Sequence, residues 1–136
     1  MNNIFKLLCV VCFFAFAKAS SAQSRETILD TTYQVSEHYN KQEVRIKMRD
    51  GVHLHTTIYS PKDTSKTYPI LMQRTPYSSK PYGEGKMRTA IAPNAYLMQE
   101  GNIIVYQDVR GRWMSEGKYD NMRAFIPNKT GTQVDE

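Results

Sequence analysis

The chain has 136 residues, with 18 Lys and Arg against 13 Asp and Glu, and a formal net charge of +5. No basic run is longer than two residues, so the sequence lacks the clustered basic face that nucleic-acid binding requires. The two cysteines, Cys9 and Cys12, both fall in an apolar segment expected to be removed, which excludes a small disulfide-stapled scaffold.

Residues 1–22 have the pattern of a secretory signal. Lys6 precedes an apolar run over 7–17, and Ser20 and Ala22 match the small-x-small cleavage pattern. The run is too short to span a bilayer as a helix. We therefore predict cleavage near Ala22, a secreted or periplasmic chain and no stable membrane anchor; a retained anchor is the alternative.

Residues 23–41 are polar and predict a loose leader with at most one turn of helix. The run "EVRIKM" then alternates with period two, which indicates a half-buried strand with Val44 and Ile46 on its apolar face. The dipeptide Asp50–Gly51 is a strong hairpin signal, and "VHLHTTIY" follows as a second strand. We predict an antiparallel hairpin.

Two further strands flank a short helix. "YPILMQ" at 68–73 is apolar without alternation, as in a strand covered on both faces, and "NIIVYQDV" at 102–109 is a second such run. Between them, Pro93 and Gly101 bound a predicted helix. A strand–helix–strand unit predicts a parallel pair with a right-handed crossover. The fold class is α/β, and the long aperiodic segment after Val109 suggests an incomplete domain.

No residue of the chain has the sequence context of a serine nucleophile. An α/β-hydrolase places this serine in a G-x-S-x-G turn, and no such segment occurs. The nearest approach is "WMSEG", in which Trp113 occupies the position where the strained turn needs a glycine. We therefore reject Ser115 as a nucleophile and interpret it as a turn residue.

His53 and His55 share a strand face, so a two-histidine metal site is conceivable. A third ligand is not evident in the sequence, and a solvated face is the preferred interpretation. We predict that the chain binds no metal.

Tyr77 lies in "QRTPYSSKPYGEG", directly after the first predicted parallel strand. In α/β-hydrolases the corresponding loop supplies half of the oxyanion hole, and a phenol can donate a hydrogen bond there. Arg74 and Pro76 would hold the loop, the proline by restricting Thr75. On position alone, a tyrosine packed over the strand end is the favoured interpretation.

Four segments in this order, "DGVHLHTTIYSP", "PILMQRTPY", "GNIIVYQDVRGRWMSEG" and "FIPNKTGTQVDE", resemble the start of the CocE/NonD-type serine hydrolases. This family includes X-prolyl dipeptidyl peptidases, cocaine esterase, α-amino acid ester hydrolases and cephalosporin (glutaryl) acylases. The resemblance implies an α/β-hydrolase core and a Ser-His-Asp triad without a cofactor.

The resemblance also assigns roles to residues. It implies that the hydroxyl of Tyr77 donates to the oxyanion hole. Asp108, Arg110 and Arg112 are expected to organise the loop at the entrance, with Arg110 paired to a buried carboxylate.

These considerations divide the chain into a signal peptide at 1–22, a leader at 23–41, and the N-terminal part of a hydrolase domain at 42–136, truncated before the nucleophile. The expected function is that of an N-terminal piece of a secreted serine hydrolase, inactive alone, whose full-length form cleaves peptide, acyl-amide or ester bonds in a small-molecule or peptide substrate. The alternative is a non-enzymatic exported binding or structural module.

Overall fold

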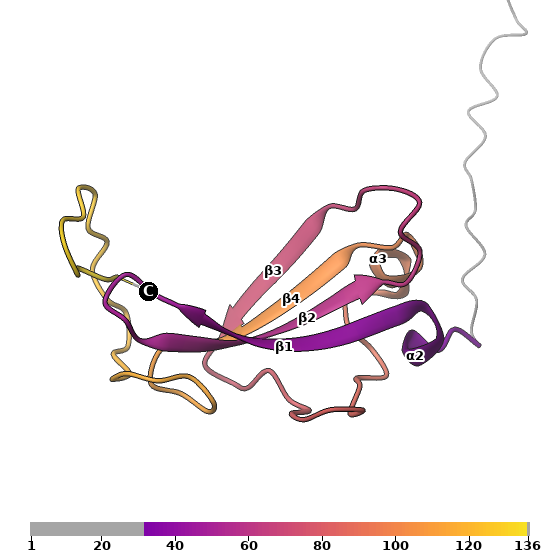
Figure 1. The fold of residues 1–136 in the computed structure, drawn as a ribbon, viewed down its shortest axis with the longest axis horizontal. Helices are drawn as coiled ribbons and strands as arrows, with labels where there is room; N and C mark the ends of the chain where they lie inside the picture. The colour runs from indigo at the N-terminus through magenta and orange to yellow at the C-terminus, as the bar shows by residue number, and fades with distance from the viewer. Residues whose placement is uncertain (1–31, 136) are drawn as a thin grey trace, which may run out of the picture.

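A computed structural model describes residues 32–135, which form a four-stranded sheet with two short helices (Figure 1). The strand order is β1-β2-β4-β3. The predicted signal segment and residues 23–31 of the predicted leader lie outside the described residues. The elements in chain order are α2 (Val35–His38), β1 (Tyr39–Lys47), β2 (His53–Pro61), β3 (Ile70–Thr75), α3 (Ala95–Gln99) and β4 (Ile103–Asp108).

Strands β1 and β2 form the predicted antiparallel hairpin, with a register that runs from Tyr39 opposite Pro61 to Lys47 opposite His53. Gly51 takes φ +89° in the turn, a conformation that glycine adopts without steric cost. Strand β1 begins at Tyr39, inside the segment predicted as leader. The leader residues Val35 and Tyr39 are almost fully buried, and this burial outweighs the polar composition around them.

Strands β3 and β4 form the predicted parallel pair, and β4 lies between β3 and the hairpin. The connecting helix α3 is shorter than the 93–101 segment predicted. Asn94 caps its first turn, because the Asn94 side chain accepts a hydrogen bond from the Leu97 N–H at 3.0 Å. These four strands form an open mixed sheet, the arrangement predicted for the start of an α/β-hydrolase domain.

The core lies on one face of the sheet, and an aromatic cluster dominates it. The buried members of this cluster are Val35, Tyr39, Tyr59, Ile91, Ile104 and Tyr106. On the same face, the phenol of Tyr106 donates to the Ile91 carbonyl at 3.0 Å, which ties the segment before α3 to the sheet.

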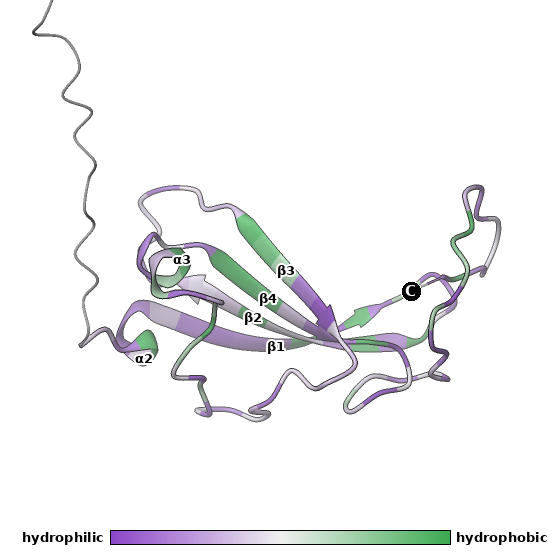
Figure 2. Cartoon of the chain, turned by 180° about the vertical axis from the view of Figure 1, so that it is seen from behind, coloured by the Kyte–Doolittle hydropathy of each residue, from purple (hydrophilic) through white to green (hydrophobic). Residues whose placement is uncertain are grey.

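The other face of the sheet is open along β3 and at Ile46, although Leu54, Thr56 and Gln107 on that face are buried. Figure 2 shows apolar residues along β3 and β4. Ile70, Leu71 and Met72 are 65, 38 and 52 % exposed, so the prediction that this strand is covered on both faces is wrong for the described residues. Ile46, predicted to face a core, is also exposed, because the core covers the face that carries Tyr39. Across residues 32–135, no helix has the length and hydropathy needed to cross a membrane.

Candidate functional site

The loops after β3 and β4 begin at the same edge of the sheet, because Thr75 and Asp108 are paired at the ends of the two parallel strands. Tyr77 stands in the first loop, with its side chain 86 % exposed. It does not pack over the strand end. Its backbone N–H donates to Thr75 Oγ1 at 3.0 Å, and within residues 32–135 its phenol has no hydrogen-bond partner.

Trp113, from the second loop, reaches across to the first. Its indole Nε1 donates to the carbonyl oxygen of Pro76 at 2.8 Å. The Pro76–Tyr77 peptide is therefore held at both of its polar ends, by Trp113 at the carbonyl and by Thr75 at the N–H. The backbone from which the Tyr77 side chain projects is fixed, while the side chain itself is in solvent.

Asp108 joins the same two loops from within the protein. Its carboxylate is fully buried and accepts hydrogen bonds from the Ser79 N–H at 2.7 Å, the Tyr82 hydroxyl at 2.8 Å and the Met114 N–H at 3.3 Å. Burial raises the pKa of the Tyr82 phenol, and the hydrogen bond to Asp108 adds to the increase, so Tyr82 stays a neutral donor. Asp108 thus contacts both sides of the proposed entrance.

Arg110 pairs with a carboxylate in the hairpin turn. The buried guanidinium donates from Nη1 to Asp50 Oδ2 at 2.8 Å and from Nη2 to Asp50 Oδ1 at 3.3 Å. Desolvation alone would raise the pKa of Asp50. The hydrogen bond and charge of Arg110, together with the Val52 N–H, outweigh it and hold this pKa below its usual range. The pair fastens the second loop to the β1–β2 turn.

The two other arginines singled out from the sequence are exposed. Arg112 places its guanidinium 4.3 Å from the centre of the Tyr119 ring, a contact within the second loop. Arg74 lines a cavity of about 560 Å³ on the face of the sheet opposite the aromatic cluster, with Met72 and Gln107 among the lining residues. Within residues 32–135, the Arg74 side chain makes no hydrogen bond or ion pair with the loop that carries Tyr77.

Ser115 is a structural residue. It is 9 % exposed, its hydroxyl donates to the Asp108 carbonyl at 2.7 Å, and it accepts from the His55 N–H at 2.8 Å. A hydroxyl held in this way joins β2 to the end of β4, and no side-chain base among the described residues hydrogen-bonds to it.

The two histidines of β2 differ in environment. His53 is partly exposed and lies 3.2 Å from a Glu116 carboxylate oxygen. His55 is only 6 % exposed and meets the Tyr82 ring edge-on, so the prediction of a solvated face is wrong for His55. No group of three potential metal-ligating side chains occurs among residues 32–135.

A clamp that sequence reasoning missed holds the far end of the Tyr77 loop. The buried Lys41 ammonium on β1 donates to Glu43 and to the carbonyl oxygen of Pro81, the latter at 2.6 Å. Glu43 also accepts from the Gly83 N–H at 2.9 Å. The only sequence signal was a pair of opposite charges two residues apart on one strand face, which is a common pattern. The contacts with Tyr82, Ser79 and Trp113 were missed as well, because they join segments distant along the chain.

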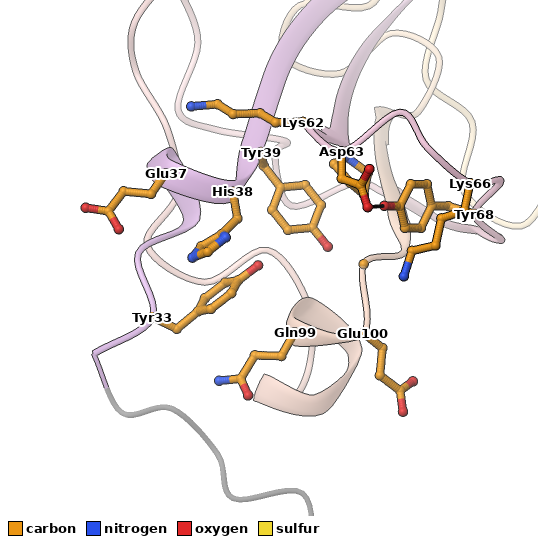
Figure 3. Close-up of a pocket in the computed structure, with 12 residues that line it drawn as sticks. Tyr33, Glu37, His38, Tyr39, Lys62, Asp63, Lys66, Tyr68, Gln99 and Glu100 are labelled. Atoms are coloured by element: carbon orange, nitrogen blue, oxygen red, sulfur yellow. Dashed lines mark hydrogen bonds between the residues drawn. The ribbon is translucent and has the colours of Figure 1, made fainter.

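A separate pocket of about 310 Å³ lies at the opposite end of the sheet, where β1 begins and β2 ends (Figure 3). The rings of Tyr33 and His38 stack in it with their centroids 4.3 Å apart. The hydroxyls of Tyr33 and Tyr39 both donate to the Met98 carbonyl, and that of Tyr68 donates to Asp63. Its phenols are thus committed to internal contacts, in contrast to Tyr77.

Comparisons with known proteins agree with this architecture. Residues 50–133 match the family model described as X-Pro dipeptidyl-peptidase (S15 family). The chain is 30 % identical over 92 residues to a cocaine esterase from Rhodococcus sp. (strain MB1 Bresler), a match that covers 68 % of this chain and 15 % of the esterase.

Two solved structures are similar to the fold. A selenomethionine-labelled α-amino acid ester hydrolase superimposes with a TM-score of 0.56 and 36 % identity, covering 78 % of this chain and 18 % of the other. An aminopeptidase from a marine sediment Thaumarchaeota archaeon gives a TM-score of 0.51 and 33 % identity, covering 84 and 20 %.

The fold and the matched residues place the chain in a hydrolase family of the S15 peptidase and esterase type. The chain belongs to the X-Pro dipeptidyl-peptidase (S15) family, and it corresponds to the N-terminal part of the CocE/NonD-type hydrolases that the sequence resembled. It spans about a fifth or less of the length of these relatives.

Proposed function

We propose that this chain is the N-terminal portion of an exported serine hydrolase that cleaves peptide, acyl-amide or ester bonds through an acyl-enzyme, and that Tyr77 donates to the oxyanion. Membership of the S15 family supports the reaction class. The names of the relatives, a cocaine esterase, an α-amino acid ester hydrolase and an aminopeptidase, support the range of bonds. The signal-like segment at 1–22 supports export.

The role of Tyr77 is supported by one observation: its two hydrogen-bond donors, the backbone N–H and the phenol, are in different environments. The backbone N–H is committed to Thr75 Oγ1, whereas the phenol is exposed and unpartnered within residues 32–135. The phenol is therefore the group of Tyr77 that is available to a substrate. A donor on a fixed backbone suits a tetrahedral intermediate, because it needs little reorganisation when negative charge develops on the oxygen.

The nucleophile, base and acid of the triad are proposed to lie outside these 136 residues. The absence of a G-x-S-x-G segment and the internal hydrogen bonds of Ser115 support this placement. On this proposal the chain alone is inactive. Asp108, Arg110 and Trp113 would then keep the entrance in shape, while the full-length protein supplies the attacking serine and uses no cofactor.

The test uses the complete product of the reading frame that encodes this chain. Replacing Tyr77 by Phe removes only the phenol oxygen, and we expect kcat on p-nitrophenyl esters and p-nitroanilides to fall about 10²- to 10³-fold. KM should change little, because the hydrogen bond forms mainly in the transition state. Tyr96→Phe, at an exposed position on α3, is the matched control and should keep full activity.

Two results would contradict the proposal. One is a Tyr77→Phe enzyme with undiminished kcat, which would remove Tyr77 from the oxyanion hole. The other is a reading frame that closes after codon 136, which would favour the exported binding module instead.

A further inference from the structure

Trp113 is the side chain through which the second loop contacts the first at the site of Tyr77. We infer that Trp113 is a positioning residue, which fixes the backbone of Tyr77 by hydrogen-bonding the preceding carbonyl. The structural part of this inference stands on the described contacts, and its catalytic consequence rests on the proposed function. The inference is independent of substrate identity.

The contact restrains the one peptide that orients Tyr77. A peptide unit is planar and carries one acceptor and one donor on opposite sides. Here the Pro76 oxygen accepts from Trp113 Nε1 at 2.8 Å, and the Tyr77 N–H donates to Thr75 Oγ1 at 3.0 Å. Rotation of the peptide plane would break both hydrogen bonds. The two bonds therefore act jointly to fix its orientation.

The indole is itself held in place by an unusual backbone. Trp113 has φ +52°, a left-handed conformation that is rare and unfavourable for bulky residues. The turn around it is closed by the Arg112 N–H to the Val109 carbonyl at 3.1 Å and by the Ser115 N–H to the Arg112 carbonyl at 2.9 Å. Strain of this kind persists only where neighbouring contacts impose it, and such positions cluster at functional sites.

Packing in the hydrophobic core does not explain why a tryptophan occupies position 113. Trp113 remains 54 % exposed, so much of its large apolar surface stays in water. The ring is instead covered from one side by Lys80 of the first loop, whose ammonium lies 5.1 Å from the ring centre. The indole hydrogen bond to Pro76 and the contact with Lys80 both reach the loop that carries Tyr77.

The first experiment needs no variant. Trp113 is the only tryptophan of the sequence, so its indole N–H gives one side-chain cross-peak in a ¹H–¹⁵N spectrum of the chain. We expect this proton to exchange with solvent at least about tenfold more slowly than in an unstructured peptide, because it is hydrogen-bonded although the ring is half exposed. Exchange at the unstructured rate would overturn the inference.

The second experiment removes the donor and follows Tyr77 itself, with ¹⁵N-tyrosine labelling and the Tyr77 amide assigned by its loss in Tyr77→Phe. Trp113→Phe keeps an aromatic ring under Lys80 but lacks the N–H. We expect the Tyr77 order parameter to fall from about 0.85 toward 0.6. Lys80→Gln removes the cation and leaves the indole donor, so it should leave Tyr77 unchanged.

The amides of Tyr59 and Tyr106 report on the core in the same spectra. An unchanged Tyr77 in Trp113→Phe, with Tyr59 and Tyr106 also unchanged, would overturn the inference. If all three change, the variant has lost its fold, and the exchange rate of the wild-type indole decides instead.

None of these measurements depends on turnover, so they separate this inference from the proposed function. In the full-length hydrolase, Trp113→Phe should lower kcat about three- to tenfold with KM retained, the size expected for one neutral hydrogen bond. If Tyr77→Phe keeps full activity, the proposed function fails while the spectroscopic result stands. If Tyr77→Phe is impaired and Trp113 proves mobile, the positioning role fails alone.

Discussion

At the scale of single residues, the site is organised by side chains that form hydrogen bonds with backbone groups. Asp108 accepts from two backbone N–H groups and one phenol, and Trp113 donates to a backbone carbonyl. Each of these contacts fixes the path of a loop without occupying the space in front of Tyr77. The side chain of Tyr77 is therefore exposed, although the backbone on either side of it is held.

Gly111 is the residue at which this arrangement leaves no room for a side chain. It has φ +67°, and a Cβ atom there would meet the backbone of Tyr119 and come within 2.6 Å of the Lys118 carbonyl carbon. Because backbone atoms cannot rotate away, we expect Gly111→Ala to lower the free energy of unfolding by more than about 3 kcal/mol, measured by urea denaturation.

Gly131→Ala is the matched control for this substitution. Its φ is +54°, but a Cβ atom there meets nothing within 4 Å, so only the conformational cost of about 1 kcal/mol applies. Equal losses of stability in the two variants would show that the close approach at Gly111 does not matter.

The position of Tyr77 could be predicted from the sequence, whereas the contacts that hold it could not. Its place follows from local order, since it comes two residues after the end of β3. The partner of Pro76 lies 37 residues away, and the partner of Ser79 lies 29 residues away. Nothing in either segment specifies which side chain meets which carbonyl until the two strands pair.

At the scale of elements, the Tyr77 loop is tied to the hairpin as well as to the neighbouring loop. The Lys41–Glu43 clamp binds the loop at Pro81 and Gly83 from strand β1. Desolvation alone would raise the pKa of Glu43. The hydrogen bonds from Lys41 and Gly83, with the Lys41 charge, outweigh it and lower this pKa. The hairpin thereby supports a loop that begins at the end of β3, the strand at the other edge of the sheet.

Glu43→Gln tests this clamp. It leaves the buried ammonium of Lys41 without its anion, and we expect a loss of about 1–3 kcal/mol of unfolding free energy at pH 7. Arg45→Gln, on the same strand, breaks an exposed ion pair with Glu116 and should cost less than about 1 kcal/mol. The two urea curves would coincide if the clamp did not contribute.

The elements themselves were largely predictable, because their periodicity is local. The hairpin and the parallel pair follow from alternation and from the apolar runs. The exposure of β3 could not be foreseen, because the run Ile70–Met72 has the same composition whether or not another layer covers it. The early start of β1 depended on the burial of Tyr39 against segments far along the chain.

At the scale of the whole molecule, the charged groups predict a fold that weakens in acid. Among residues 32–135, five carboxyl groups have a pKa below the ordinary value in the folded state, namely Glu43, Asp50, Asp63, Glu116 and Asp135. Their ionised forms stabilise the fold at any pH above the ordinary carboxyl pKa of about 4, and this contribution is lost as the pH falls through the lower, folded-state values.

Thermal melts between pH 7 and pH 3 would measure this dependence. We expect Tm to stay nearly constant down to about pH 5 and to fall below about pH 4. The Glu43→Gln variant should show a smaller decrease, because one of the titrating groups is gone. A Tm that rises on acidification would contradict the pKa directions.

The two edge strands of the sheet differ in how readily a further strand could pair with them. Strand β1 presents the exposed Arg45 and Lys47 at one margin, and such charges discourage further pairing. Strand β3 presents Ile70, Leu71 and Met72 at the other. A fifth strand added alongside β3 and parallel to it would finish next to Thr75. A side chain at the C-terminal end of that strand would then lie beside the start of the loop that carries Tyr77.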